Sequence, residues 1–242
     1  MTQKNRGPIL RQPAQALRNL GYELPALILL LLLAGVMWIS LSIADTTGDG
    51  AHRIDEWLIL AMRDPQDIAH PWGPMWLKEL GRDFTSLGSI GILTFVTLSV
   101  AGYLGLHGKN RIMLLVLAAF AGGILLSFIM KSGFDRPRPE LVPYGTEVFS
   151  TSFPSAHALM AAATYLTLGA LLARVHRGRR TKAYILSIAV STTIIVGLSR
   201  IYMGVHWPSD VLAGWAMGAA WAVLCSLVAR RLQMRGRVEQ QM

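Results

Sequence analysis

The chain has 242 residues, of which 52% are hydrophobic and only 15% charged, against about 25% charged in an ordinary soluble domain. This composition argues against a soluble globular protein and favours a membrane-embedded one. The formal net charge is +9, and the single cysteine, Cys225, excludes both an intrachain disulfide and a cysteine-based metal cluster.

Six stretches of the chain contain no Lys, Arg, Asp or Glu. They are residues 25–44, 84–106, 112–130, 158–173, 183–199 and 211–229. A helix needs roughly 20 apolar residues to cross the hydrocarbon core, and four of the stretches meet that length directly. The sequence therefore predicts an all-α fold, a six-transmembrane-helix bundle over residues 25–229, with basic tails at 1–24 and 230–242.

The first stretch has an alternative interpretation as a cleaved signal peptide, because its flank is basic and residues 42–44 loosely resemble a cleavage site. Its apolar run exceeds the roughly 7–15 residues of a signal-peptide core, which favours an uncleaved first span. The loop that follows, about residues 45–83, is the longest. Residues 54–62 are apolar but too short to span, and with Trp57, Trp72 and Trp76 nearby we expect them to lie along the membrane interface.

The basic residues predict the orientation of the spans, because short cytoplasmic loops carry an excess of Lys and Arg. Fifteen of the 23 basic residues fall in the two tails and in the second and fourth loops. They are Lys4, Arg6, Arg11, Arg18, Lys109, Arg111, Arg174, Arg177, Arg179, Arg180, Lys182, Arg230, Arg231, Arg235 and Arg237. Both termini are therefore predicted to be cytoplasmic, with the long first loop extracytoplasmic. The basic excess is a topology signal, so we expect no nucleic-acid partner.

Three polar clusters lie at the ends of the predicted spans. Polar residues placed there cost free energy, so they indicate a functional site. They cover residues 131–139 after the third span, 154–157 at the start of the fourth, and 199–210 between the fifth and sixth. With six spans and a cytoplasmic N-terminus, all three clusters meet at the same extracytoplasmic rim.

The first kind of chemistry in these clusters is anion binding. Lys131, Arg138 and Arg200 supply positive charge, and the forked donors of arginine match phosphate oxygens. Ser155 precedes an apolar helix, whose free N–H groups and dipole also favour phosphate. We therefore expect these four residues to form a phosphate clamp.

The second kind of chemistry is nucleophilic attack with proton transfer. His206 and Asp210 are four residues apart, and Pro208 between them suits the first turn of a helix. The carboxylate would hold one imidazole nitrogen as N–H and leave the other free to attack. His157, from another helix, could protonate a leaving oxygen. Together with the clamp, this set predicts phosphoryl transfer.

The pattern Lys-x6-Arg-Pro, Pro-Ser-x-His, Ser-Arg-x5-His-x3-Asp resembles the type-2 phosphatidic-acid phosphatase superfamily, which includes membrane lipid phosphatases and the vanadium haloperoxidases. The matching positions are Lys131, Arg138, Pro139, Ser155, His157, Ser199, Arg200, His206 and Asp210. The resemblance implies a metal-independent phosphatase with a helical core and no cofactor. It also implies a phosphohistidine at His206 oriented by Asp210, with His157 as the acid and then the base for water. One departure is Ala156, where the family usually has Gly.

Several neighbouring residues have plainer interpretations. Arg136 does not fit the six-residue spacing from Lys131, so we expect it to pair with Asp135 or to face solvent. Gly214 and Gly218 predict close helix packing in the last span. No carboxylate and histidine set has metal-ligand spacing, and we expect no metal site.

The sequence thus favours a multi-pass cell-membrane phosphatase that acts on a lipid phosphate or diphosphate at the extracytoplasmic, periplasmic face of a bacterial membrane. The candidate substrates are phosphatidic acid, phosphatidylglycerol phosphate, undecaprenyl diphosphate and lipid A phosphate. A lipid phosphotransferase using the same histidine and a non-catalytic lipid-phosphate carrier remain as alternatives, whereas a haloperoxidase would not require six spans. The motif residues recognise the phosphate group and not the lipid tail, so they do not distinguish these substrates. They also specify no oligomeric state.

Overall fold

A computed structural model describes residues 11–45, 51–139 and 151–234, and the named secondary-structure elements in this part of the chain are all α-helices. The all-α prediction is therefore confirmed. The outermost parts of both predicted tails, with Lys4, Arg6, Arg235 and Arg237, lie outside the described residues. The elements are α1 (Arg11–Asp45), α2 (Ala51–Leu60), α3 (Met75–Ser86), α4 (Ile90–Leu106), α5 (Asn110–Ser132), α6 (Ala156–Val175), α7 (Arg179–Tyr202) and α8 (Pro208–Met234).

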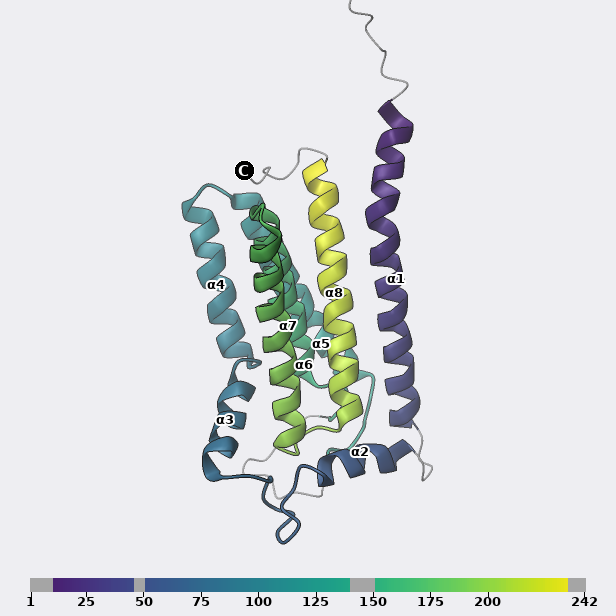
Figure 1. The fold of residues 1–242 in the computed structure, drawn as a ribbon, viewed down its shortest axis with the longest axis vertical. Helices are drawn as coiled ribbons and strands as arrows, with labels where there is room; N and C mark the ends of the chain where they lie inside the picture. The colour runs from purple at the N-terminus through teal and green to yellow at the C-terminus, as the bar shows by residue number, and fades with distance from the viewer. Residues whose placement is uncertain (1–10, 46–50, 140–150, 235–242) are drawn as a thin grey trace, which may run out of the picture.

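Five of these helices are long and apolar enough to cross a membrane, namely α1, α5, α6, α7 and α8. The pair α3 and α4 meets the same test only when joined, and it is bent by 52°. The described helices thus provide five spans, or six if the bent pair counts as one. The long helices run side by side, and α1 begins at the end of the bundle where α8 finishes (Figure 1).

The bend changes the expected second span. Residues 84–86 belong to α3, and α4 begins only at Ile90, because Ser89 caps it by accepting a hydrogen bond from the Ile92 amide at 3.4 Å. Gly88 lies in the break against α6 and α7. A Cβ there would stand 2.5 Å from Val196 Cγ1 and 3.2 Å from His157 Cβ, so only glycine lets the bend approach this closely.

The centre of the bundle is α6, which packs against α5, α7 and α8. Its contact with α8 depends on Gly214 and Gly218, as the sequence predicted. A Cβ at Gly214 would lie 2.7 Å from the Ser155 carbonyl oxygen, and one at Gly218 would collide with the Leu159 carbonyl. The two backbones can therefore approach as closely as small residues allow in membrane helices.

Helix α2 lies across one end of the bundle (Figure 1), with both a carboxylate and an apolar side chain on its buried face. Asp55 and Ile59, one turn apart, are buried at 2% and 0% exposure. Ile54, Trp57 and Leu60 on the other face are 56%, 67% and 42% exposed. The apolar residues expected at the membrane interface thus belong largely to a short helix, and three of its large apolar side chains point away from the protein.

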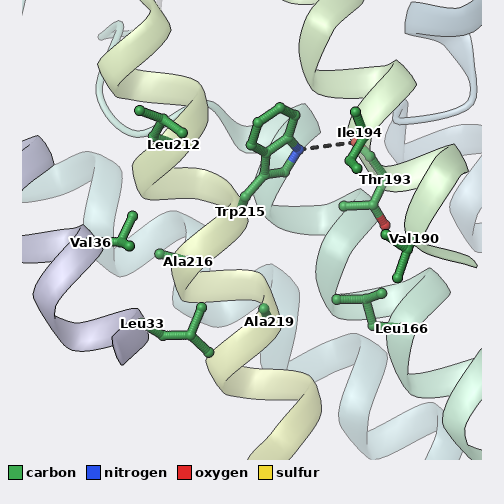
Figure 2. A pocket seen from close by; sticks show the side chains of 10 residues that line it. All are labelled: Leu33, Val36, Leu166, Val190, Thr193, Ile194, Leu212, Trp215, Ala216 and Ala219. Atoms are coloured by element: carbon green, nitrogen blue, oxygen red, sulfur yellow. Dashed lines mark hydrogen bonds between the residues drawn. The ribbon is translucent and has the colours of Figure 1, made fainter. Parts of the chain in front are cut away.

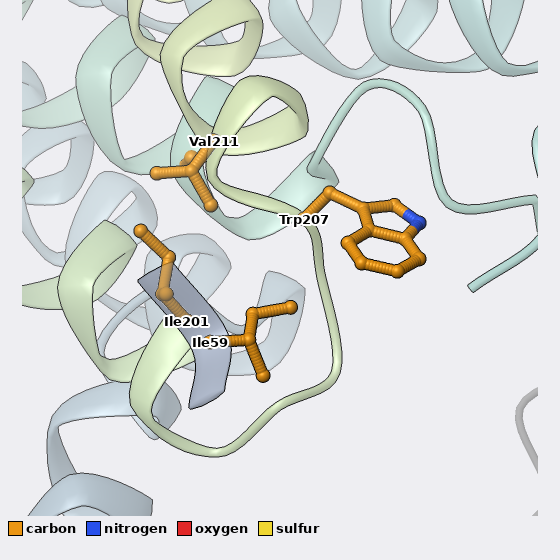
Figure 3. Packing of buried hydrophobic residues seen from close by; sticks show 5 residues of the cluster. Ile59, Ile201, Trp207 and Val211 are labelled. Carbon is orange, nitrogen blue, oxygen red and sulfur yellow. The ribbon is translucent and has the colours of Figure 1, made fainter. Parts of the chain in front are cut away.

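The inner face of α2 meets the ends of α7 and α8 in one apolar cluster. Figure 3 shows Ile59 beside Ile201 of α7, Val211 of α8 and Trp207, which precedes α8. Just beyond α2, the Arg63 Nη2 donates to the Tyr202 carbonyl at 2.7 Å. These contacts fix the first loop against the turn that joins α7 to α8.

A separate apolar cavity of about 240 Å³ lies between α1, α6, α7 and α8 (Figure 2). Trp215 stands at one end of it, with its indole N–H donating to the Thr193 carbonyl at 3.0 Å. The described residues that line this cavity include none from the three polar clusters.

Candidate active site

The turn between α7 and α8 presents His206 to the end of the bundle. Helix α7 ends at Tyr202, and Gly204 adopts φ +72°, in the left-handed region that glycine reaches without strain. The Val205 amide then donates back to the Arg200 carbonyl at 3.2 Å. Helix α8 begins at Pro208, as the sequence predicted, so His206 lies just before its first turn.

Asp210, in that first turn, is fully buried and its side chain is held on both oxygens. Oδ2 accepts from the Trp207 amide at 2.9 Å and from the Ser152 hydroxyl, and it lies 3.5 Å from His206 Nδ1. Oδ1 accepts from Arg136 Nη1 at 2.6 Å. The carboxylate therefore faces the imidazole in a fixed orientation.

The other imidazole nitrogen of His206 points toward the predicted phosphate clamp. Arg138 Nη1 lies 3.2 Å from Nε2 and also donates to the Val205 carbonyl at 2.7 Å. Burial lowers the pKa of His206 to about 4, and the positive charges of Arg200 and Arg138 act in the same direction, whereas Asp210 opposes them. At neutral pH the imidazole is uncharged and has a lone pair to offer.

The remaining predicted residues come from the facing ends of α5 and α6. Ser155 is the N-cap of α6, with Oγ accepting from the Ala158 amide at 3.5 Å, and its own amide donates to the Asp210 carbonyl at 3.0 Å. His157, in the first turn of α6, lies within electrostatic range of Lys131, Arg138, Arg200 and His206. The structure thus brings all seven predicted site residues to one end of the bundle.

Arg200 carries a feature typical of an anion site. Its Nε is buried, and no described residue accepts a hydrogen bond from it. A buried guanidinium donor without an acceptor costs free energy unless a ligand supplies the missing oxygen. Lys131 and Arg138 add two further cations in the same region, so the site is suited to an oxyanion.

The prediction for Arg136 is wrong. This side chain is buried, and instead of pairing with Asp135 it donates to Asp210, to the Ser209 hydroxyl at 2.7 Å and to Asp55 at 2.8 Å. Its guanidinium also lies 5.5 Å from the centre of the Trp207 ring. The spacing argument assigned Arg138 rather than Arg136 to the predicted clamp, but it could not find the carboxylates that hold Arg136.

Three site-lining residues escaped the sequence analysis, namely Asp55, Ser152 and Ser209. Asp55 accepts from the Ser209 amide at 2.9 Å, so a helix in the first loop caps α8. A signal for Asp55 existed in the one-turn spacing to Ile59, which marks an inward face. The two serines carry no such signal. Among the described residues, no group of three His, Cys, Asp or Glu side chains is placed to hold a metal ion.

Comparison with known proteins identifies the family. Residues 112–234, slightly more than half of the chain, match the family model described as the PAP2 superfamily. The protein belongs to the PAP2 superfamily. The match covers all but the first two residues of α5 and the whole of α6, α7 and α8, and therefore every residue of the three polar clusters.

Other PAP2 proteins show the same relationship over a larger part of the chain. Phosphatidylglycerophosphatase B of Bacillus subtilis is 32% identical over 144 residues, covering 59% of this chain and 70% of the relative. Decaprenylphosphoryl-5-phosphoribose phosphatase of Mycobacterium tuberculosis is 33% identical over 147 residues, covering 59% and 76%. The crystal structure of a transmembrane PAP2-type phosphatidylglycerolphosphate phosphatase from B. subtilis superposes with a TM-score of 0.69 at 27% identity, covering 83% of this chain and 96% of that one. The fold is therefore that of a multi-pass PAP2 membrane protein.

Proposed function

We propose that this PAP2 protein is an integral membrane phosphatase that removes a phosphate from a lipid phosphate or diphosphate through a phosphohistidine at His206. The observation that carries the proposal is the double orientation of His206, with Nδ1 toward Asp210 and Nε2 toward Arg138. An imidazole held in this way keeps its Nε2 lone pair directed at the region where cations would bind phosphate.

In the proposed mechanism, Nε2 of His206 attacks phosphorus while Asp210 accepts the Nδ1–H bond and stabilises the charge that develops on the ring. His157 gives its proton to the leaving oxygen of the lipid. It then takes a proton from the water that cleaves the phosphohistidine, which returns the site to its starting state. Lys131, Arg138, Ser155 and Arg200 bind the phosphoryl oxygens, and each donor aimed at the transition state is worth a few kcal/mol. These steps require no metal ion.

We further propose that the site faces the extracytoplasmic side of the membrane. The loops between α4 and α5 and between α6 and α7 lie at the end of the bundle opposite the site (Figure 1). These loops and the first turns of α5 and α7 carry Lys109, Arg111, Arg177, Arg179 and Arg180. Short loops rich in Lys and Arg are retained in the cytoplasm. The catalytic unit would then comprise residues 25–229, with residues 1–24 and 230–242 as cytoplasmic tails.

The proposed substrate class is a phosphate at headgroup depth on a membrane-anchored lipid. The two relatives described above act on phosphatidylglycerophosphate and on a decaprenyl-linked phosphoribose phosphate by their names, so both a glycerophospholipid and a polyprenyl lipid fit the family. The exposed apolar surfaces of α1, α4 and α5 would keep the protein in the same layer as either substrate.

The test is phosphate release by purified protein in mixed micelles with EDTA present. Phosphatidic acid, phosphatidylglycerol phosphate and undecaprenyl diphosphate are compared with a soluble phosphate ester, and His206→Ala is the control. We expect release from a lipid that survives EDTA and disappears in the variant. Phosphate transfer to an added lipid acceptor without release would instead support a phosphotransferase, and lipid binding without either reaction would support a carrier.

A further inference from the structure

A buried ion network extends behind Asp210, on the side away from His206, and the mechanism above does not use it. Arg136 donates from Nη1 to Asp210 Oδ1 at 2.6 Å and from Nη2 to Asp55 Oδ2 at 2.8 Å. All three side chains are buried. They come from three separate parts of the chain, namely α2, the segment after α5, and α8.

Stability alone is a weak reason for such a network. Removing charges from water is costly, and buried ion pairs are often no more stabilising than apolar side chains of similar volume. The bonds within the network suggest a different reason, because they define the position of a carboxylate that faces the reactive histidine.

The hydrogen bond from Arg136 helps to fix the plane of the Asp210 carboxylate. Arg136 occupies Oδ1, and the Trp207 amide and Ser152 hydroxyl occupy Oδ2, which is the oxygen nearest His206 Nδ1. A turn about the Cβ–Cγ bond that falls short of exchanging the two equivalent oxygens would break these hydrogen bonds.

Asp55 holds Arg136 in the same way from the opposite side. Its Oδ2 accepts from Arg136 and from the Ser209 hydroxyl, and its Oδ1 accepts from the Ser209 amide at 2.9 Å. Asp55 is thereby bound to the first turn of α8, which also contains Asp210. Arg136 is bracketed by two carboxylates whose separation is set by the α8 backbone.

The charges lead to the same conclusion. Asp55 and Asp210 are two buried carboxylates with the guanidinium of Arg136 between them. Without this cation, two like charges would remain in a site with little solvent, and one of them would take up a proton. A protonated Asp210 would no longer accept the Nδ1–H bond of His206.

We infer that Arg136 and Asp55 are positioning residues for the reaction proposed above: Asp55 holds Arg136, Arg136 keeps Asp210 ionised and oriented, and Asp210 keeps Nε2 of His206 available for attack. The inference rests on the proposed function, and it adds α2 to the machinery of the site. Because Arg136 bonds to Asp210 and Asp55, on the side of Asp210 away from His206, we expect both residues to act on turnover rather than on substrate binding.

The first experiment separates turnover from binding. Arg136→Gln and Arg136→Lys are compared with wild type, and Arg53→Gln, an exposed cation on α2, is the matched control. We expect Arg136→Gln to lower kcat about 10- to 100-fold, as loss of outer residues that orient reactive groups does elsewhere, with KM unchanged. Arg136→Lys should recover part of kcat because it restores the charge without the fork. A folded Arg136→Gln protein with wild-type kcat, or with a raised KM alone, overturns the inference.

The second experiment is a double-mutant cycle with Asp55→Asn, which preserves the shape of the side chain. If Asp55 acts through Arg136, Asp55→Asn lowers kcat in the wild-type background and has little further effect in Arg136→Gln. Losses that multiply in the double variant would show that the two residues act independently and would refute the proposed chain of contacts. If Arg136→Gln does not fold, the same cycle is run with Arg136→Lys.

A third measurement does not depend on activity. Nitrogen-15 NMR of histidine-labelled protein, with His206→Ala to assign the signal, reports which nitrogen of His206 carries the proton. We expect the Nδ1–H tautomer in wild type and a mixture in Arg136→Gln. If wild type releases no phosphate but the tautomer still differs between wild type and Arg136→Gln, the proposed function is refuted and the positioning role is retained. Active wild type with an unchanged tautomer in the variant would refute the positioning role alone.

Discussion

Replacement of Asp210 by Asn gives the sharpest expectation for the site, because the two isosteric side chains differ in one hydrogen-bonding group. Arg136 Nη1, 2.6 Å from Oδ1, requires an acceptor, so the amide oxygen takes that position. The amide nitrogen then replaces Oδ2, where it meets the Trp207 N–H at 2.9 Å and His206 Nδ1 at 3.5 Å. It can only donate to Nδ1, which moves the imidazole proton to Nε2 and removes the attacking lone pair.

The size of the effect follows from these contacts. A carboxylate-to-amide change that imposes the wrong histidine tautomer lowers kcat by as much as about 10⁴-fold in a serine protease, so we expect a loss of about 10²- to 10⁴-fold here. That range corresponds to about 3–5 kcal/mol in the activation barrier. The buried Trp207 N–H loses its acceptor, so the free energy of unfolding should fall by about 1–3 kcal/mol as well.

The assay is lipid phosphate release in mixed micelles, with thermal unfolding in the same detergent. Asp83→Asn, an exposed change of the same kind on α3, is the control and should leave both quantities unchanged. A folded Asp210→Asn protein with kcat within a few fold of wild type would refute the orientation of His206 argued above.

Three further expectations concern other parts of the site and the bundle. Arg138→Ala should lower kcat/KM by about 10²- to 10³-fold, measured by phosphate release, since it removes a donor aimed at the phosphoryl group; a change below tenfold would exclude it from the clamp. Because protonation removes the lone pair of His206 and burial lowers its pKa to about 4, kcat/KM should fall as pH decreases through about 4. An acid limb near the ordinary histidine value, about 6.5, would contradict this. Gly214→Ala should lower the free energy of unfolding by about 1–3 kcal/mol through its contact with the Ser155 carbonyl, whereas Gly91→Ala, which meets nothing within 4 Å, should not; equal effects on thermal unfolding would refute the close packing of α6 and α8.

Five of the expected spans, and the motif residues that the structure places at one end of the bundle, could be predicted because their signals are local in the sequence. Apolar length identifies a membrane helix without knowledge of its neighbours, and the spacing from Lys131 to Arg138 is contained in one turn-and-loop segment. The bend between α3 and α4 was not predicted. It depends on Gly88 approaching Val196 and His157, which are distant in the sequence, and the uncharged stretch that predicted a single span continues through the break.

Arg136 illustrates the opposite case. Its neighbours in the sequence include Asp135, an obvious partner, yet the structure gives it two carboxylates that lie 81 and 74 residues away. The partner of a buried charge depends on which segments the fold brings together. For Arg136 these segments are α2 and the first turn of α8, which meet at the same end of the bundle. Asp55 could have been suspected from its spacing to Ile59, but only the fold connects it to α8.

The exposed apolar side chains of α2 have a practical consequence for handling the protein. Ile54, Trp57 and Leu60 point outward from a helix whose other side holds Asp55. Once the bilayer is removed, a detergent must replace lipid on this short helix as well as around the spans. We expect small, harsh detergents to cover the spans but to leave α2 poorly supported, so that extraction would inactivate the protein well before it unfolds. Added phospholipid or a lipid nanodisc should then restore turnover without changing the helical content.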